Sequence, residues 1–298
     1  MIFDWCRHCS EHKTMTEEHL PPKATGNDSE VTLFTKSEDP ARVVLHHFRE
    51  GHALPSLCGS CNTGASNRGL PQAYTAWDRD VTAWIQRAAL ELCENYGAEP
   101  EDIWSVHHSD GRATELCINH GKGLDLDGMN NLHPGRIARQ VLGMVLAVQR
   151  NDVLLKQHPQ LAAAYFSEAA SSIAPFSLHV ALANAGINYL TSGAMLATIP
   201  LTADAAAALA DSGPEIHFWM ISFPPFLICL SEGSTAPITA ARIDHWFDQP
   251  TNKTFSKSMR KMAYPIALHR EPVVRNLYAG LYEQTEPPTV RTRKPHSP

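Results

Sequence analysis

Two Cys-x-x-Cys pairs near the start of the chain constrain its fold more than any other feature. Cys6 and Cys9 form the first pair, and Cys58 and Cys61 form the second. Each pair can direct two thiolates at one ion, and two pairs complete the tetrahedron of a structural zinc site. A redox dithiol is the alternative, but such motifs normally lie at the strand-to-helix junction of a thioredoxin-like unit, and the residues around Cys6 lack that pattern. The spacing therefore predicts a structural Zn²⁺ that ties two distant stretches together.

The overall composition indicates an ordinary globular protein. The chain has 298 residues, of which 43% are hydrophobic and 19% charged. Its first residues, Met-Ile-Phe-Asp-Trp-Cys, include no positively charged leader, and the longest apolar run, residues 216–230, contains two prolines and is shorter than the roughly 20 residues of a membrane span. We expect a cytoplasmic protein with no membrane partner.

Charge is unevenly distributed along the chain. The net charge is −6, yet residues 251–298 hold nine Lys or Arg against three Asp or Glu. Basic side chains in this region could contact phosphate groups, namely Lys253, Lys257, Arg260 and Lys261. For the final basic residues, 291–294, a solvated tail is the favoured interpretation.

Residue patterns predict a mixed α+β fold. Helical periodicity predicts helices over 73–95, from Pro134 onward, over 159–172 and over 202–210. β-branched and aromatic runs predict strands over 31–35, 42–48, 176–183, 187–190, 195–199, 216–222 and 226–231, and a hairpin over 103–108 and 114–119. We expect a zinc-stapled module in residues 1–80, a mostly helical region in 81–172, a β-rich region of unknown role in 173–284 and a mobile tail in 285–298.

A second kind of site is indicated between the two cysteine pairs. Glu18 and His19 are adjacent in Glu-His-Leu-Pro-Pro, and Asn62 directly follows the last cysteine. Phosphodiester hydrolysis needs an activated water and a cation that neutralises the phosphate, and carboxylate and amide oxygens are ligands suited to Mg²⁺. The zinc would bring these residues together, because Asn62 is tethered to one of its ligands. The alternative is that Glu18 and His19 only stabilise a loop.

The order Cys-x-x-Cys, Glu-His-x-x-Pro, Cys-x-x-Cys-Asn resembles the HNH endonucleases, the ββα-metal nucleases. The resemblance covers residues 1 to about 80. It implies a metal-dependent endonuclease that cuts DNA, with His19 as the general base and with Glu18 and Asn62 as ligands of a catalytic Mg²⁺ or Mn²⁺. It also suggests a bacterial or phage setting, in restriction or defence. The family usually has an Asn before the second cysteine pair that pins the loop carrying the base; here His52 is the nearest polar residue.

Further residues are assigned to support and to DNA contact. His46 and His47 alternate on a predicted strand, so one of them could line the site. The local candidates for phosphate contact are Lys23, Arg42, Arg49 and Arg68, with surface solvation as the alternative for each. No motif assigns a role to residues 81–298, which are expected to serve substrate choice, homo-oligomerisation or a regulatory partner. A zinc-stapled nucleic-acid-binding or interaction protein without hydrolysis is the second hypothesis.

Overall fold

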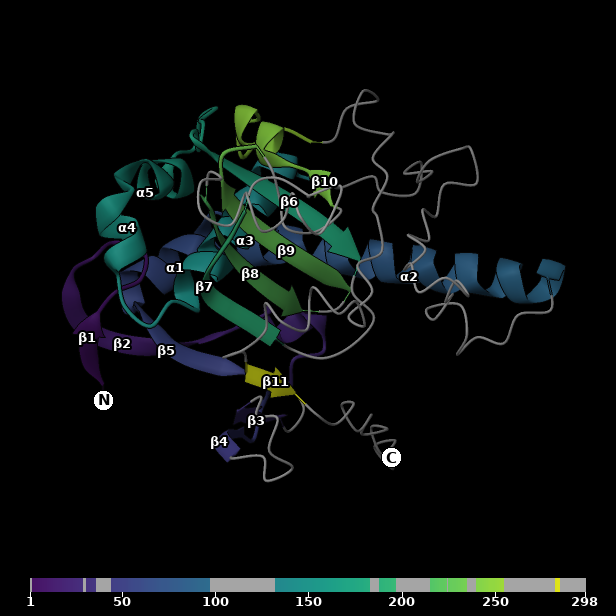
Figure 1. Ribbon diagram of the computed structural model, residues 1–298, viewed down its shortest axis with the longest axis horizontal. Helices are drawn as coiled ribbons and strands as arrows, with labels where there is room; N and C mark the ends of the chain where they lie inside the picture. Colours follow the sequence, from purple (N-terminus) through teal and green to yellow (C-terminus); the bar gives the residue numbers. More distant parts are fainter. Residues whose placement is uncertain are drawn as a thin grey trace, which may run out of the picture.

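The computed structural model describes residues 2–28, 31–35, 44–96, 132–182, 188–196, 215–223, 225–234, 240–254 and 282–284. Within these ranges the chain forms two antiparallel sheets and five α-helices, so the predicted α+β class is confirmed (Figure 1). The smaller sheet has the strand order β1-β2-β5, and the larger sheet has the order β10-β6-β9-β8-β7-β11-β3-β4.

The smaller sheet carries the segments between the cysteine pairs. It consists of β1 (Phe3–Trp5), β2 (His12–His19) and β5 (Ala53–Cys58), and α1 (Gly59–Asn67) follows β5 directly. Sequence patterns do not reveal β2, because Met15 is its one fully buried residue and the strand is held by pairing on both sides. Opposite Glu17, β5 contains an extra residue, since Thr16 pairs with Leu57 and Glu18 pairs with Leu54. Such a bulge bends a strand and redirects its side chains.

The larger sheet confirms most of the predicted strands. Its members are β3 (Val31–Thr35), β4 (Val44–Phe48), β6 (Phe176–Leu182), β7 (Asn188–Leu196), β8 (Glu215–Phe223), β9 (Phe226–Glu232), β10 (Ala241–Arg242) and β11 (Tyr282–Gln284). The prediction of two short strands over 187–190 and 195–199 is wrong, because β7 is continuous. Its register against β8 shifts between Leu190 and Gly193. This bulge accommodates one extra residue in β7, so the strand continues across the two polar residues between them.

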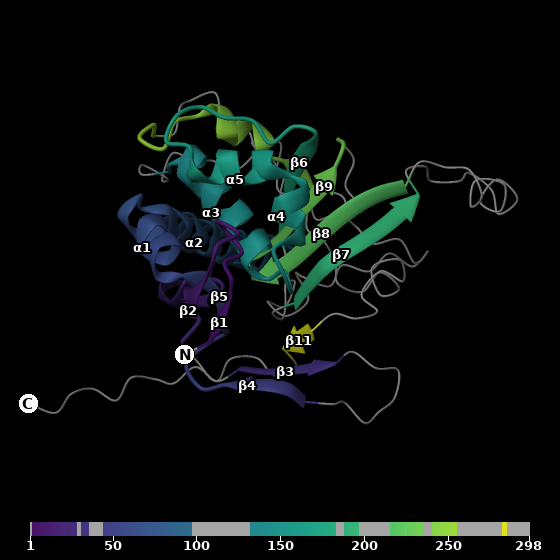
Figure 2. The same cartoon turned by 90° about the vertical axis from the view of Figure 1, so that its left-hand side faces the viewer.

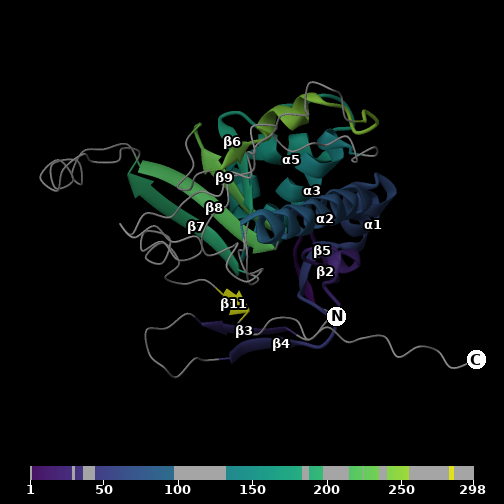
Figure 3. The ribbon, with the colours of Figure 1, turned by 90° about the vertical axis from the view of Figure 1, so that its right-hand side faces the viewer.

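Helices cover one face of the β6–β9 part of the larger sheet (Figures 2 and 3). They are α2 (Leu70–Tyr96), α3 (Pro134–Ala147), α4 (Val153–Gln157) and α5 (Pro159–Phe166). Two 3-10 turns are also present in the described residues, η1 (Lys23–Thr25) and η3 (Asp244–Asp248). The predicted helix over 159–172 ends earlier, at Phe166, because Ser167 is extended. His158 separates α4 from α5, since a residue before proline disfavours the helical conformation.

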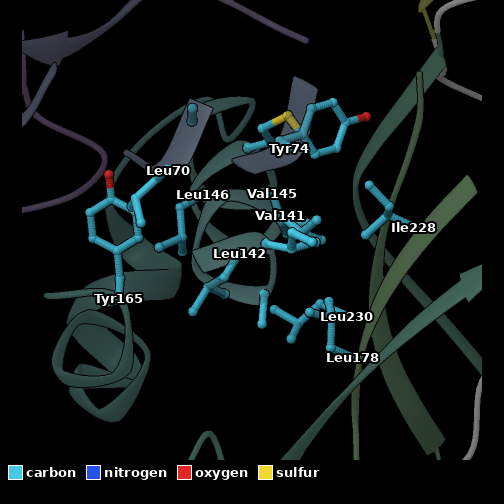
Figure 4. Close-up of a cluster of buried hydrophobic side chains, with 14 of the residues drawn as sticks. Leu70, Tyr74, Val141, Leu142, Val145, Leu146, Tyr165, Leu178, Ile228 and Leu230 are labelled. Carbon is cyan, nitrogen blue, oxygen red and sulfur yellow. The ribbon is translucent and has the colours of Figure 1, made fainter. Parts of the chain in front are cut away.

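The core forms around α3, which is buried on every side. Side chains of α2, α5 and strands β6 and β9 meet those of α3 in one cluster, and Figure 4 labels Leu70, Tyr74, Val141, Leu142, Val145, Leu146, Tyr165, Leu178, Ile228 and Leu230 within it. The Trp77 ring of α2 stacks on Phe226 with 3.8 Å between ring centroids. Trp77 is fully buried and therefore belongs to the core.

Several predictions fall on residues that the structure does not describe. These are the hairpin over 103–119, the helix over 202–210, the side chains of Arg42, Lys257, Arg260 and Lys261, and the tail from 285. The proposed boundaries after residues 80, 172 and 284 stay predictions. Across the described ranges, none of the helices has the length and apolar character needed to cross a membrane.

Candidate metal centre and active site

Four cysteines converge where β1, β5 and α1 meet. The sulfur atoms of Cys6, Cys9, Cys58 and Cys61 all lie within 4.8 Å of one another, and those of Cys9 and Cys58 are 3.9 Å apart. A tetrahedral zinc with Zn–S bonds of about 2.3 Å would place its sulfur ligands roughly 3.8 Å apart. The four-cysteine cluster is therefore consistent with a structural zinc site, as the spacing predicts.

The close packing of the thiols shifts their pKa values in opposite directions. A hydrogen bond with Cys61 lowers the pKa of Cys6 to about 4, and the same bond raises the pKa of Cys61. Burial raises the pKa of Cys9 to about 11. Close sulfur atoms cannot all ionise without a cation among them, and Zn²⁺ supplies that charge.

The two residues inside the first cysteine turn bind it to α3 and to the residues that follow α3. Arg7 donates from Nε to the Gln149 carbonyl at 3.0 Å and from a terminal nitrogen to the Arg150 carbonyl at 2.8 Å. His8 bonds the Gly143 carbonyl through Nε2 at 2.9 Å, and burial lowers its pKa to about 4. A Cβ on Gly143 would lie 2.7 Å from the Tyr165 ring, so this close approach requires glycine. His8 thus has a structural role.

Asn62 lies beside the end of β2. Its Nδ2 donates to the Glu17 carbonyl and to the Thr16 hydroxyl, both at 3.2 Å. Both amide hydrogens are thereby directed at β2, and Oδ1 is left as an acceptor or ligand atom. The structure therefore places Asn62 next to the backbone of the residue before Glu18, as the cysteine spacing predicts.

Glu18 and His19 occupy different environments. Glu18 is half-buried and forms no ion pair within the described part of the chain, and burial raises its pKa to about 7. His19 donates from Nε2 to the Glu50 carbonyl at 3.0 Å. A carbonyl only accepts hydrogen bonds, so the proton of a neutral ring resides on Nε2 and the free lone pair on Nδ1. His19 is thus oriented in the tautomer in which Nδ1 can act as a base.

A buried clamp that sequence patterns do not reveal holds the loop after His19. Asn27 is 7% exposed and donates from Nδ2 to the carbonyls of Pro21 and His52 at 2.7 and 3.0 Å. The fully buried His52 bonds the Leu20 carbonyl through Nδ1 at 2.8 Å. Both residues tie the segment after His19 to the start of β5. The supporting role of His52 in catalysis stays a prediction, and Asn27, polar and in a loop, carries no sequence signal of burial.

The remaining candidates divide by position. His46 and His47 lie in β4, which pairs with β3 in the larger sheet. Arg68 packs on α5, where it donates to the Tyr165 carbonyl at 2.5 Å and its guanidinium lies 4.7 Å from the Tyr165 ring centre. Arg68 therefore has a structural role in the fold. Lys23 and Arg49 are exposed.

Comparison with protein-family models, with curated proteins and with solved structures finds no match.

Proposed function

We propose that this protein is a metal-dependent nuclease of the ββα-metal type, which hydrolyses phosphodiester bonds in DNA. The observation that carries the proposal is the contact of Asn62 with the β2 backbone at Glu17. The contact brings the amide of α1 to the strand end that carries Glu18 and His19. Strands β2 and β5 pair antiparallel and α1 follows β5, which is the ββα order of the family name with strands β3 and β4 inserted between β2 and β5.

In the proposed reaction His19 removes a proton from water through Nδ1, while the Glu50 carbonyl holds the ring by Nε2. Glu18 and the Oδ1 atom of Asn62 would hold a Mg²⁺ or Mn²⁺ ion, which when bound neutralises charge on the phosphate and the leaving oxygen. Within the described ranges the Glu18 carboxylate is half-buried with no cationic partner and the Asn62 Oδ1 atom has no hydrogen bond, and both features suit a hard divalent ion. The four cysteines hold the structural zinc and take no part in the chemistry.

Plasmid nicking tests the proposal. Zinc-loaded protein is incubated with supercoiled plasmid and Mg²⁺ or Mn²⁺, alongside His19→Ala and His12→Ala. His12 is the matched control, because it lies at the other end of β2, roughly 23 Å away at 3.3 Å per residue. We expect His19→Ala to cut at least about 100-fold more slowly and His12→Ala to cut at the wild-type rate.

Two outcomes would contradict the proposal. Equal cutting by wild type and His19→Ala would show that His19 is not the base. DNA binding with no cutting under either metal would instead identify a zinc-stapled binding protein that lacks hydrolytic activity.

A further inference from the structure

A shallow groove lies between the loop after His19 and the start of α2. It has a volume of about 350 Å³ and is lined by Pro22, Lys23, Ala24, Pro71, Gln72, Thr75, Ala76 and Arg79. The loop supplies one wall, and the first three turns of α2 supply the other. Gln72, Ala76 and Arg79 follow one another at helical spacing, so they form one stripe beside the buried face of α2.

The groove adjoins the proposed base through a short chain of contacts. Lys23 pairs with the Glu50 carboxylate at 3.1 Å, and the Glu50 carbonyl accepts the hydrogen bond from His19. If the scissile phosphate of a DNA strand lay at His19, the next nucleotide of that strand would lie over the groove. The groove's volume lies at the lower end of the range for small-ligand sites, which suits one nucleotide unit.

The lining suits a sugar-phosphate segment. Its floor is apolar, with two proline rings and two alanine methyl groups, and such surface can contact a deoxyribose or the face of a base. Each wall carries one cation: the side chain of Lys23 is 49% exposed, and that of Arg79 is 73% exposed. Arg79 pairs with Asp80 at 3.2 Å, and exposed ion pairs of this kind are weak, so a phosphate can displace the aspartate.

We propose that this groove binds the DNA nucleotide next to the scissile phosphate, with Lys23 and Arg79 contacting the backbone and Ala76 leaving room for the sugar. The inference rests on the nuclease function proposed above. It adds the first turns of α2 to the DNA-binding surface.

Binding of a short fluorescein-labelled duplex, measured without Mg²⁺ or Mn²⁺ over a range of salt, tests the groove. Arg79→Gln removes one cation, and Ala76→Phe fills the groove without changing the charge. Arg242→Gln is the matched control, because Arg242 is also exposed and pairs with a nearby aspartate, Asp244. Arg79→Gln is expected to weaken binding about 3- to 10-fold and to reduce the salt slope by about one. Ala76→Phe is expected to weaken binding with the slope unchanged.

The possible outcomes distinguish DNA binding by the groove from hydrolysis of DNA. Weaker binding by both groove variants than by Arg242→Gln supports the groove, even when plasmid cutting is absent and hydrolysis is thereby excluded. If the wild type and the three variants all cut plasmid and bind DNA with the same affinity and salt slope, the groove does not bind DNA. The proposed nuclease activity would then stand. Absence of DNA binding by the wild-type protein overturns both.

Discussion

Asn27 holds His52 by both backbone polar groups. Its Oδ1 accepts from the His52 amide at 2.6 Å, and its Nδ2 donates to the His52 carbonyl at 3.0 Å. The same Nδ2 donates to the Pro21 carbonyl. The buried side-chain amide of Asn27 therefore fixes the loop that follows His19 against His52, the residue directly before β5.

Removing the Asn27 amide should destabilise the fold and slow the reaction. Asn27→Ala loses three hydrogen bonds and leaves buried backbone groups unpaired, at a cost on the order of 2–4 kcal/mol. Urea unfolding measures this loss, with the exposed Asn67→Ala as the control. We expect kcat to fall with KM nearly unchanged, because the loop positions His19. A loss below about 0.5 kcal/mol would show that Asn27 does not hold the loop.

Gly51 should tolerate no side chain. Its φ is +87°, and an added Cβ would lie 2.0 Å from the Asn27 carbonyl oxygen. Gly26 has a φ of +89° with nothing within 4 Å of the same position, so Gly26→Ala measures the backbone strain alone. That strain costs on the order of 1 kcal/mol, and Gly51→Ala should cost at least about 2 kcal/mol more in thermal or urea unfolding. Equal destabilisation of the two variants would contradict the close packing of Gly51 on Asn27.

The four-cysteine cluster predicts one zinc per chain. Cys61→Ser should lose the metal and most of the order of residues 1–70, because structural zinc contributes on the order of 10 kcal/mol. Cys229→Ser is the control, since Cys229 is buried in β9, outside the cluster. Elemental analysis should find zinc retained in the control and absent from Cys61→Ser. Full zinc in both variants would contradict the assigned ligands.

Asp78 should make stability depend on pH. It is 7% exposed on α2, its Oδ2 has no hydrogen-bond partner among the residues that the structure describes, and burial raises its pKa from 3.8 to about 7. The folded state therefore favours the protonated acid, so the stability that this group contributes falls as pH rises from about 4 to about 7. Asp78→Asn should stabilise the protein by on the order of 2–4 kcal/mol near pH 8 and have little effect near pH 4.

Urea unfolding at several pH values measures this difference. Asp80→Asn, two residues further along α2 and partly exposed, controls for the loss of one negative charge from the helix. A pH-independent effect of Asp78→Asn would contradict the buried, unpaired carboxyl.

Sequence patterns predict the elements whose residue types directly reflect metal binding or burial. The cysteine spacing predicts the cluster because a metal requires all four thiolates at one point. The apolar runs of β6, β8 and β9 and the helical periodicity of α2 and α3 reflect burial that the structure confirms. Asn62 contacts the Glu17 backbone, and its place directly after a cluster cysteine leaves it little freedom.

Other features depend on partners distant in the chain. Strand β2 is polar and has a single buried side chain. Its own sequence therefore does not predict a strand, which forms by pairing with β1 and β5. Helix α1 contains two glycines and no large apolar residue, yet it begins inside the second cysteine turn, directly after Cys58, and includes the thiol of Cys61. Asn27 and Arg68 are of polar types that usually lie at the surface. Their contacts with His52 and Tyr165 form only once the chain has folded.

The most direct test of the proposed chemistry is chemical rescue of plasmid nicking in His19→Gly. We expect this variant, loaded with zinc and supplied with Mn²⁺, to cut at least about 100-fold more slowly than wild type and to regain activity as free imidazole is added. His12→Gly should cut normally and not respond to imidazole. Cutting by His19→Gly at the wild-type rate without imidazole would contradict the assignment of His19 as the base.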